Sequence, residues 1–257
     1  MTQPDIKDTE FTPDDNKLEA LGRLSSKVSH DLNNILGAIE GYSTLVLNTL
    51  KEGDPIKPDL EEIRRAVAKA AALTRSLLLF SRRQALHKEP CDLNAAAQKL
   101  GAAMAGAAGH SVLQLDLQAG LPALLADPAL PEQVLTVLAM NASEAMPDGG
   151  PVRITTRAMT LAPHEIRSRN QTEAGRTFVV LSVKDEGRGM NKDTLEHIFE
   201  PFFTTKPKGQ GTGLGLSAVY GAVTRNNGWL TVRTGEGKGT EFLVYLPVAD
   251  APAPPRP

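Results

Sequence analysis

A histidine stands directly before a carboxylate near the start of the chain, in the segment Ser29–Asn34. Imidazole is a nucleophile and a proton acceptor near neutral pH, because the unperturbed pKa of histidine is about 6.5. The carboxylate of Asp31 can accept a hydrogen bond from one ring nitrogen of His30, which leaves the other nitrogen free to attack. Asn34 follows His30 by one helical turn, so its amide can position a water molecule on the same face. The segment predicts chemistry at His30, although the same pair alone would be an ordinary surface histidine and acid.

Two glycine-rich loops in the second half of the chain are suited to a nucleotide. The loop 209–215, with glycine at every second position, comes directly before a predicted helix, so its backbone can approach a ligand while the helix amides face an anion. The loop 185–190 follows a predicted strand and begins with Asp185, and Gly187 and Gly189 let a flat ring come close. The loop 209–215 predicts a site where backbone N–H groups bind phosphate. The loop 185–190 predicts that Asp185 accepts a hydrogen bond from an exocyclic amine.

Two further segments could complete such a site. The segment Ile198–Lys206 contains three phenylalanines that can anchor a mobile lid, and Lys206 can meet phosphate charge. Asn141, on a predicted helix, offers a neutral oxygen suited to one coordination position of Mg²⁺, with phosphates and water supplying the others. Taken singly, Ile198–Lys206 would be interpreted as part of a hydrophobic core, and Asn141 as an asparagine without a special role.

In this order the segments resemble the histidine protein kinases of two-component signalling, over roughly residues 17 to 247. Within that family the chain looks most like the catalytic cores of hybrid and nitrogen-regulation-type kinases. The family's H, N, G1, F and G2 boxes are matched by His30–Asn34, Asn141–Ala145, Asp185–Gly189, Phe199–Lys206 and Gly211–Gly215, and its closing Gly-Thr-x-Phe by Gly239–Phe242.

The resemblance implies ATP and Mg²⁺ as cofactors, with Asn141 as the metal ligand and His30, Asp31 and Asn34 as the catalytic residues. It implies autophosphorylation of His30 and transfer of the phosphoryl group to an aspartate on a separate response-regulator receiver domain, with dephosphorylation of that regulator as a further role. The residues that would bind ATP are Asn141, Asp185, Gly187, Gly189, Phe199, Lys206, Gly211, Thr212, Gly213, Leu214, Gly215 and Thr240.

Two alternatives remain open on the sequence. Val137 stands one helical turn before Asn141, where the family usually has a second asparagine, and this favours a histidine phosphotransfer or scaffold protein with a degenerate ATP site. A Bergerat-fold ATPase or serine kinase would share Asn141 and Asp185, but it would have no reason to carry His30 on a dimer-forming helix.

The elements that position these residues follow from periodicity. Apolar or small residues alternate three and four apart over 18–46 and again over 60–81, as in a coiled-coil seam. His30 lies between two positions of the first seam, and the glycine and prolines of 51–58 break the pattern. We therefore expect an antiparallel helical hairpin whose remaining apolar surface is covered by a second copy, which gives a homodimer with a four-helix bundle.

From Cys91 onward the pattern changes to that of an α/β sandwich, which the resemblance identifies as the Bergerat type. The predicted fold is thus multidomain, α followed by α/β. We expect a disordered leader over 1–15, the dimerisation and phosphotransfer domain over 16–88, a hinge at Leu86–Asp92, the ATP-binding domain over 91–248 and a disordered tail over 249–257. Helices are predicted at 94–108, 127–146 and 214–226, and strands at 111–117, 152–156, 178–183, 229–234 and 241–246.

Composition excludes several classes of protein. The chain has 28 Lys and Arg against 30 Asp and Glu, so no charge excess argues for nucleic acid. A single cysteine excludes an internal disulfide framework and fits a reducing compartment. Apolar runs fall short of the roughly 20 residues of a membrane helix, and the acidic start does not resemble a signal peptide. We expect a soluble cytoplasmic protein with no direct membrane insertion.

Overall fold

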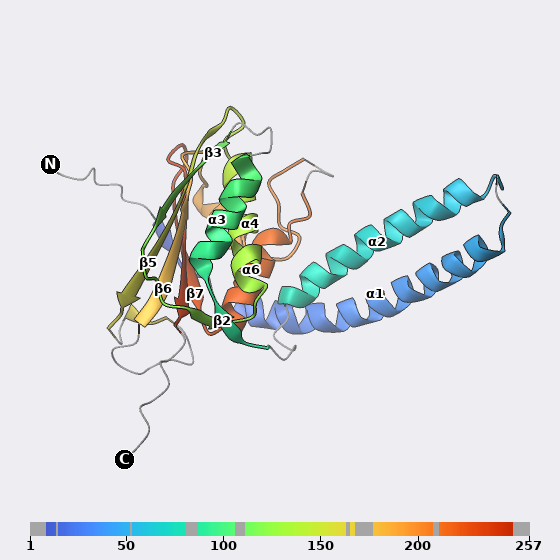
Figure 1. Cartoon of the computed structure of the whole chain (residues 1–257), viewed down its shortest axis with the longest axis horizontal. Helices are drawn as coiled ribbons and strands as arrows, with labels where there is room; N and C mark the ends of the chain where they lie inside the picture. The colour runs from blue at the N-terminus through green and yellow to red at the C-terminus, as the bar shows by residue number, and fades with distance from the viewer. Residues whose placement is uncertain are drawn as a thin grey trace, which may run out of the picture.

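The computed structural model combines a long helical hairpin with an α/β domain (Figure 1). It describes residues 9–13, 15–51, 53–80, 87–105, 111–162, 165–167, 177–207 and 211–248. For 9–10, 15–30, 72–73 and 75–80 the description covers the backbone alone. The predicted tail over 249–257 and most of the predicted leader lie outside these ranges.

The hairpin consists of α1 (Asp15–Thr49) and α2 (Lys57–Phe80), as predicted. Its turn contains Gly53, whose φ of +85° is a conformation that favours glycine. The carboxylate of Asp54 accepts a hydrogen bond from the backbone N–H of Ile56 at 3.0 Å, which stabilises the turn before α2 begins. The base of the hairpin meets the α/β domain, where α2 contacts α6 (Gly215–Arg225).

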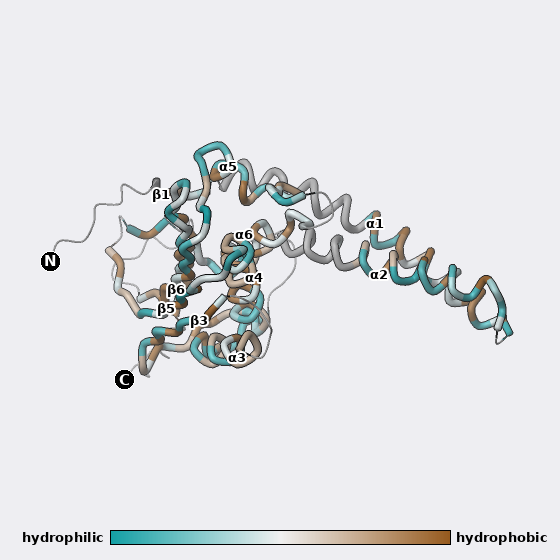
Figure 2. The backbone as a smooth tube through the Cα atoms, turned by 90° about the horizontal axis from the view of Figure 1, so that it is seen from above, coloured by the Kyte–Doolittle hydropathy of each residue, from teal (hydrophilic) through white to brown (hydrophobic). Residues whose placement is uncertain are grey.

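The two helices of the hairpin pack through small residues and leave a separate apolar stripe uncovered. Ser43 of α1 and Val67 and Thr74 of α2 are buried. The described part of the α1 seam instead faces away from α2, and Ile35 and Tyr42 are 57% and 72% exposed in the single chain. Figure 2 shows hydrophobic positions recurring along this projecting part. Despite the stripe, none of the described helices is long and apolar enough to cross a membrane.

The α/β domain is built on a six-stranded sheet in the order β1-β7-β8-β6-β5-β3. All neighbouring strands are antiparallel except β3 and β5, which are parallel. The strands are β1 (Thr9–Phe11), β3 (Ser111–Leu117), β5 (Gly150–Thr160), β6 (Thr177–Lys184), β7 (Trp229–Thr234) and β8 (Thr240–Pro247). The shorter β2 (Glu89–Cys91) and β4 (Leu124–Ala126) form a second, two-stranded sheet.

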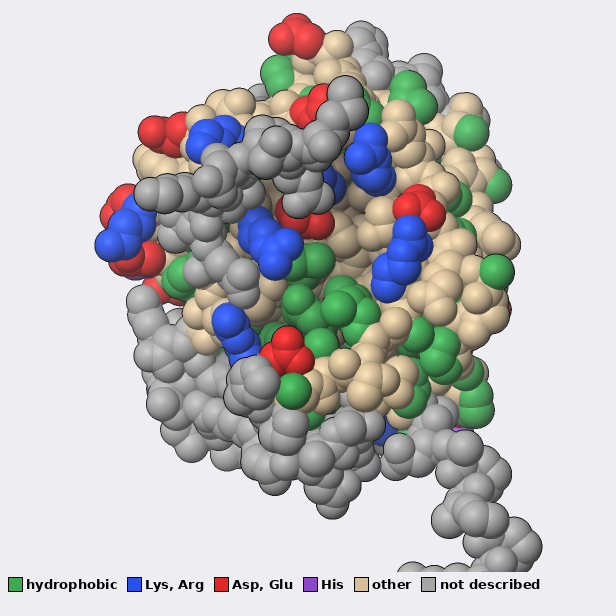
Figure 3. All heavy atoms as spheres, turned by 90° about the vertical axis from the view of Figure 1, so that its left-hand side faces the viewer, with side chains coloured by type: hydrophobic (Ala, Val, Ile, Leu, Met, Phe, Trp, Pro, Cys, Tyr) green, Lys and Arg blue, Asp and Glu red, His purple; other side chains and the backbone are tan. Residues whose placement is uncertain are grey.

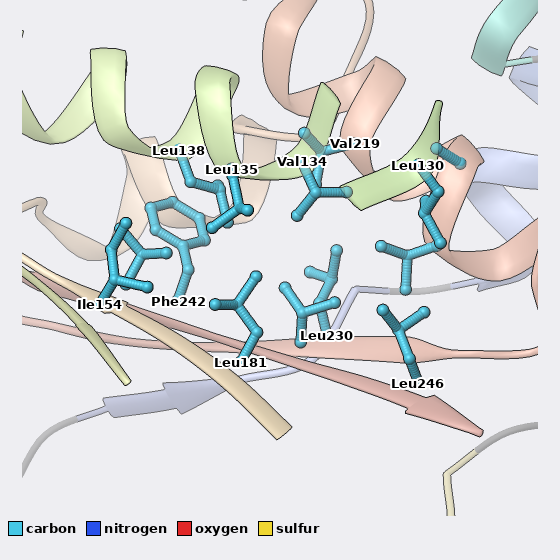
Figure 4. Close-up of a cluster of buried hydrophobic side chains, with 14 of the residues drawn as sticks. Leu130, Val134, Leu135, Leu138, Ile154, Leu181, Val219, Leu230, Phe242 and Leu246 are labelled. Carbon is cyan, nitrogen blue, oxygen red and sulfur yellow. The ribbon is translucent and has the colours of Figure 1, made fainter. Parts of the chain in front are cut away.

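Helices α3 (Leu93–Ala105), α4 (Leu130–Glu144) and α6 cover one face of the main sheet (Figure 1), and α5 (Lys192–His197) follows β6. Figure 4 shows Leu135 and Leu138 of α4 pointing toward Leu181 of β6, with Val219 of α6 beside them. All four side chains are almost fully buried, and each contributes roughly 1.5–3 kcal/mol through burial. Pro131 lies in the first turn of α4, where the missing N–H costs nothing.

The opposite face of the sheet carries a smaller aromatic cluster. The ring of Trp229 lies 4.9 Å from that of Phe178 in an edge-on arrangement and is stacked on Tyr245 at 4.7 Å. Figure 3 shows this face, where hydrophobic side chains gather near the centre and charged side chains are scattered around them. This smaller aromatic cluster holds β6, β7 and β8 together. The same strands flank the loops of the candidate site.

The expectation of a disordered leader is wrong for its last residues. Thr9–Phe11 forms β1, which pairs with β7 in the register Thr9 with Thr234 and Phe11 with Val232. Phe11 packs against the main core, and the hydroxyl of Thr12 accepts a hydrogen bond from Arg167. The segment gains backbone pairing from a sheet edge that already exists, so it needs no strong strand pattern of its own.

The expected hinge is also corrected. Of the segment Leu86–Asp92, Leu86 lies outside the described residues and Glu89–Cys91 forms β2, paired with β4 inside the ATP-binding domain. Cys91 is buried, and its thiol lies 3.4 Å from the carbonyl of Ala126. Chain that is paired and packed in this way moves with the domain, so any hinge lies before β2.

Candidate functional site

A cavity of about 700 Å³ opens between α4, the loop after β6, the segment 198–206 and the start of α6. Its size lies within the range of roughly 300–1,000 Å³ that is usual for small-molecule sites. Three segments that follow one another between residues 185 and 216 therefore meet α4, which lies about 40 residues earlier in the sequence, at one place. The predicted residues that line the cavity are Asn141, Asp185, Gly189, Lys206, Gly211, Thr212, Gly213, Gly215 and Thr240.

Three predicted ligand contacts are not among the lining residues. Phe199 is only 3% exposed and belongs to the core, where its ring lies 5.9 Å from that of Tyr220. Leu214 is also buried in the core, directly before α6. Gly187 acts through its neighbour, because its backbone N–H donates to the carboxylate of Asp185. Phe199 and Leu214 do not line the cavity as expected. Their side chains instead support the segments that form it.

Asp185 is the buried acid of the site. Its Oδ1 accepts hydrogen bonds from the backbone N–H groups of Gly187 at 2.8 Å and Thr240 at 3.1 Å. Burial raises the pKa of Asp185 above its ordinary value, and the two N–H donors oppose part of that rise. Both described hydrogen bonds end on Oδ1, so Oδ2 is the oxygen that remains for a donor on a ligand.

Glycine is required at two bends of the cavity wall. Gly189 has a φ of +63°, and a Cβ there would lie 1.9 Å from the carbonyl oxygen of Gly235. Gly213 has a φ of +65°, and a Cβ there would lie 2.4 Å from the carbonyl carbon of Phe202. Any side chain at either position would force the loops apart, so these two glycines are required by close packing of the protein's own backbone. The predicted approach of a ligand to the glycine loops stays a prediction.

The segment 198–206 is held to both sides of the cavity. The backbone N–H of Phe202 donates to the carbonyl of Gly213 at 3.0 Å, and Phe202 itself adopts a positive φ of 69°. The ammonium group of Lys206 forms an ion pair with Glu144 at the end of α4. Glu144 lines the cavity and was not predicted as a site residue, although it lies in the same segment as Asn141. This ion pair holds the lysine at the edge of the cavity.

The start of α6 provides an anion-binding end. Gly211, Gly213 and Gly215 line the cavity immediately before and at the first turn of the helix. The first N–H groups of a helix have no partner within the helix, and the helix dipole makes this end positive. No side chain caps α6 at Leu214. These N–H groups suit phosphate oxygens.

Asn141 is an incompletely satisfied polar side chain on the cavity wall. Its Nδ2 is buried and has no hydrogen-bond partner, whereas most buried donors are paired. Val137, one turn earlier, presents a methyl surface to the same cavity. Within the described residues, no three His, Cys, Asp or Glu side chains are grouped closely enough to hold a metal ion. Asn141 lines the cavity, and its amide oxygen fits a metal that takes its remaining ligands from phosphates and water.

His30 lies on the helical backbone of α1, outside the part of the helix whose side chains are described. One residue further on, Asp31 is exposed, and so is Asn34. Between them, Asn33 is half-buried and bonded to α2. The face of α1 that meets α2 here includes Asn33, which was not a predicted seam position, whereas the predicted seam residues Leu32 and Ile35 are exposed in the single chain.

Comparison with known families matches both parts of the chain. The family described as the His Kinase A (phospho-acceptor) domain matches residues 20–86, which include His30. The family described as the histidine kinase-, DNA gyrase B- and HSP90-like ATPase matches residues 126–250, which include the segments around the cavity. The helical hairpin and the α/β domain therefore each have a recognised counterpart.

Similar proteins and structures agree with these matches. The sensor kinase CckA of Brucella abortus is 42% identical over 233 residues, covering 90% of this chain and 24% of CckA. The crystal structure of full-length ShkA in complex with AMPPNP is similar with a TM-score of 0.60 and 25% identity, covering 91% of this chain and 48% of ShkA.

ThkA in complex with the response regulator protein TrrA gives a TM-score of 0.54 at 20% identity, covering 91% of this chain and 64% of that chain, and this likeness shows the fold alone. The chain spans 24% of CckA and 48% of a further curated relative, the sensor histidine kinase ZraS of Klebsiella oxytoca.

Proposed function

The chain belongs to the histidine kinases of two-component signalling, and from this premise we propose that it phosphorylates its own His30 with ATP. The observation that carries the proposal is the meeting of four sequence segments around one cavity of nucleotide size, with a buried acid at one place and a helix N-terminus at another. A hairpin matched by a phospho-acceptor family then supplies the group that receives the phosphate.

In the proposed complex, Asp185 accepts a hydrogen bond from the exocyclic amine of adenine. The free oxygen of its carboxylate supports this assignment, because the other oxygen is already occupied by two backbone donors. The phosphates lie toward the start of α6, where Gly213 and Gly215 expose backbone N–H groups. Lys206 lies at the edge of the same cavity, where Glu144 holds its ammonium group within reach of the phosphates. The nucleotide is thus fixed at its base and at its phosphates.

We further propose that the nucleotide is bound with Mg²⁺ and that Asn141 supplies one oxygen ligand. Bound magnesium neutralises charge on the phosphate oxygens. Asn141 lines the cavity in which the phosphates are proposed to lie, so its amide oxygen would be available as a metal ligand there. Val137 offers no oxygen where a second ligand could stand, so this chain relies on fewer protein ligands.

The reaction itself is an in-line displacement. A ring nitrogen of His30 forms a bond to the γ-phosphorus, the bond from that phosphorus to the bridging β,γ-oxygen breaks, and ADP leaves. Asp31 accepts a hydrogen bond from the other ring nitrogen, so that it stabilises the positive charge that develops on the ring. The chain contributes mainly position and charge, which is what phosphoryl transfer requires.

The proposed partners, a second copy of the chain and a response regulator, are assigned to exposed surfaces of the hairpin. The exposed stripe of α1, which includes Ile35 and Tyr42, supports a homodimer in which two hairpins form a four-helix bundle. The phosphoryl group then passes to an aspartate on a separate response-regulator receiver domain in the cytoplasm. Asn34 is exposed near His30, which suits a role in positioning water during dephosphorylation of that regulator. ThkA, which has the same fold, has been crystallised with a response regulator.

The alternatives have less support. A scaffold with a degenerate ATP site would rest on Val137 alone, whereas the buried acid and the glycine bends are all in place. A serine kinase or simple ATPase would leave the match to a phospho-acceptor domain over residues 20–86 without a use.

Incubation of the purified chain with γ-labelled ATP and magnesium tests the proposal. Phosphohistidine is labile in acid and stable in base, whereas phosphoserine survives acid. We expect the label to be retained at alkaline pH and lost in acid. An acid-stable label would support a serine kinase, and tight ATP binding without any label would support the scaffold, so either result would contradict the proposal.

A further inference from the structure

A partly buried hydrogen bond joins the two helices of the hairpin close to His30. The hydroxyl of Thr74 on α2 lies 2.6 Å from Oδ1 of Asn33 on α1, across 41 residues of sequence. Thr74 is 5% exposed, so the α2 end of this contact is shielded from water. The same hydroxyl also lies 3.0 Å from the carbonyl of Ala71 in its own helix, which gives it a local acceptor as well.

A hydroxyl is not needed at this position for packing alone. Thr74 and Val67 lie seven residues apart on the same stripe of α2, and both are buried against α1. Valine has almost the shape of threonine, since both are branched at Cβ, and would fill the space without a polar atom. The hydroxyl has two acceptors, the carbonyl of Ala71 in its own helix and Oδ1 of Asn33 on α1, and only the second joins the two helices.

The position of Asn33 on α1 links this bond to His30. Successive residues of an α-helix are about 100° apart around its axis, so Asn33 lies roughly 60° to one side of His30 and Asn34 roughly 40° to the other. Asn33 is half-buried and turned toward α2, whereas Asn34 is exposed. When Asn33 is held, the direction in which the helix presents both His30 and Asn34 is held as well.

We propose that Thr74 is a positioning residue for the phosphoacceptor: by binding Asn33 it fixes the rotation of α1 about its axis at His30. The inference rests on the proposed function and deepens it. Thr74 makes no contact with ATP or with the reacting atoms. It acts by keeping the ring of His30 in the direction from which an ATP-binding domain or a receiver domain can reach it.

The substitution Thr74→Val removes the hydroxyl and keeps the shape. We expect a roughly 3- to 10-fold fall in the kcat of His30 phosphorylation, which corresponds to one lost hydrogen bond between uncharged groups. The KM for ATP should stay unchanged, because the nucleotide cavity is not touched. Thr74→Ser keeps a hydroxyl and should restore most of the rate. Asn33→Ala should lower kcat as Thr74→Val does, and the double variant should be no worse than either single one.

A matched control separates positioning from stability. Ser43 is another buried hydroxyl of the hairpin, but it donates to the carbonyl of Ile39 in its own helix at 2.7 Å. Ser43→Ala therefore removes a buried hydroxyl without breaking a bond between helices, and its kcat should remain close to wild type. Circular dichroism checks that each variant is helical. If Thr74→Val does not fold, the comparison rests on Asn33→Ala against Ser43→Ala.

The outcomes are distinguishable. Wild-type kcat in Thr74→Val, an equal loss in Thr74→Ser, or additive losses in the double variant would overturn the positioning role while leaving the kinase intact. A fall in kcat of the same size in Ser43→Ala would show that the effect is only loss of hairpin stability. Absence of labelled His30 in the wild-type chain would instead remove the proposed function, and the positioning role with it.

Discussion

Asp185 and Thr240 are joined by a hydrogen bond of 3.1 Å from the backbone N–H of Thr240 to Oδ1 of the carboxylate, across 55 residues of sequence. The bond ties the loop after β6 to the first residue of β8. It also occupies one carboxylate oxygen, so that the other remains for the ligand. The buried acid is thus held in place by backbone rather than by side chains.

The substitution Asp185→Asn should weaken ATP binding by roughly 10- to 100-fold, because an uncharged amide replaces a charged hydrogen-bond acceptor. The amide oxygen can still accept from Gly187 and Thr240, so the thermal unfolding midpoint of the ATP-free chain should not fall. Calorimetric titration with a non-hydrolysable ATP analogue measures the affinity. Wild-type affinity in this variant would contradict the assignment of Asp185 to the adenine amine.

The pH dependence of nucleotide binding should reflect protonation of the Asp185 carboxylate. Burial raises the pKa of Asp185, so its carboxylate takes up a proton at a higher pH than an exposed aspartate does. As pH falls through that raised pKa, the acceptor form is lost and ATP affinity should decrease. The sign for folding is opposite: the ionised group costs stability above the raised pKa, and this cost disappears on acidification.

Affinity measured against pH in wild type and in Asp185→Asn isolates this effect, since protonation of ATP itself is common to both. Parallel curves for the two proteins would show that another group is responsible.

Val137→Asn tests the effect of the missing second asparagine. The new side chain would present an oxygen to the cavity one turn from Asn141, so the affinity for ATP should become more dependent on magnesium and tighter when it is present. Val137→Thr is the control, because threonine is close in volume to valine and its polar group is shorter than that of asparagine. Titration of the analogue with and without magnesium gives the comparison. An unchanged magnesium dependence would mean that this wall of the cavity lies away from the metal.

Ile35→Asp should convert a homodimer to a monomer. Ile35 lies on the uncovered stripe of α1 and is 57% exposed in the single chain, and a buried unpaired charge in the bundle would be costly. Ile56→Asp is a matched control, because Ile56 is 52% exposed in the turn of the hairpin, away from that stripe. Sedimentation equilibrium reports the mass. Dimers of equal strength in both variants would place the interface elsewhere.

Long periodic elements were the most predictable part of the fold. The strands at 111–117 and 229–234 occur at the predicted bounds, because alternation over six or seven residues is a strong signal. The strands β1, β2 and β4 are three residues each, which is too short to show a period. They form because a neighbouring strand offers its edge, and that neighbour is known only from the tertiary structure.

The site was predictable as a set of segments but not residue by residue. Glycine loops identified where the backbone approaches, and Asp185 could be named because it follows a strand and precedes two glycines. Phe199 and Leu214 were included because they lie in matching segments, but alternate side chains of such segments face the core. Glu144 was missed because its partner, Lys206, is 62 residues away in sequence.

The measurement that tests the central claim most directly is the position of the phosphoryl group. Wild type and His30→Gln are incubated with γ-labelled ATP and magnesium, and each is examined for base-stable, acid-labile label together with the affinity for a non-hydrolysable ATP analogue. We predict label on the wild-type chain only, with equal affinity for the analogue in both. Acid-labile label on His30→Gln would contradict the account, since the phosphate would then be carried by another residue.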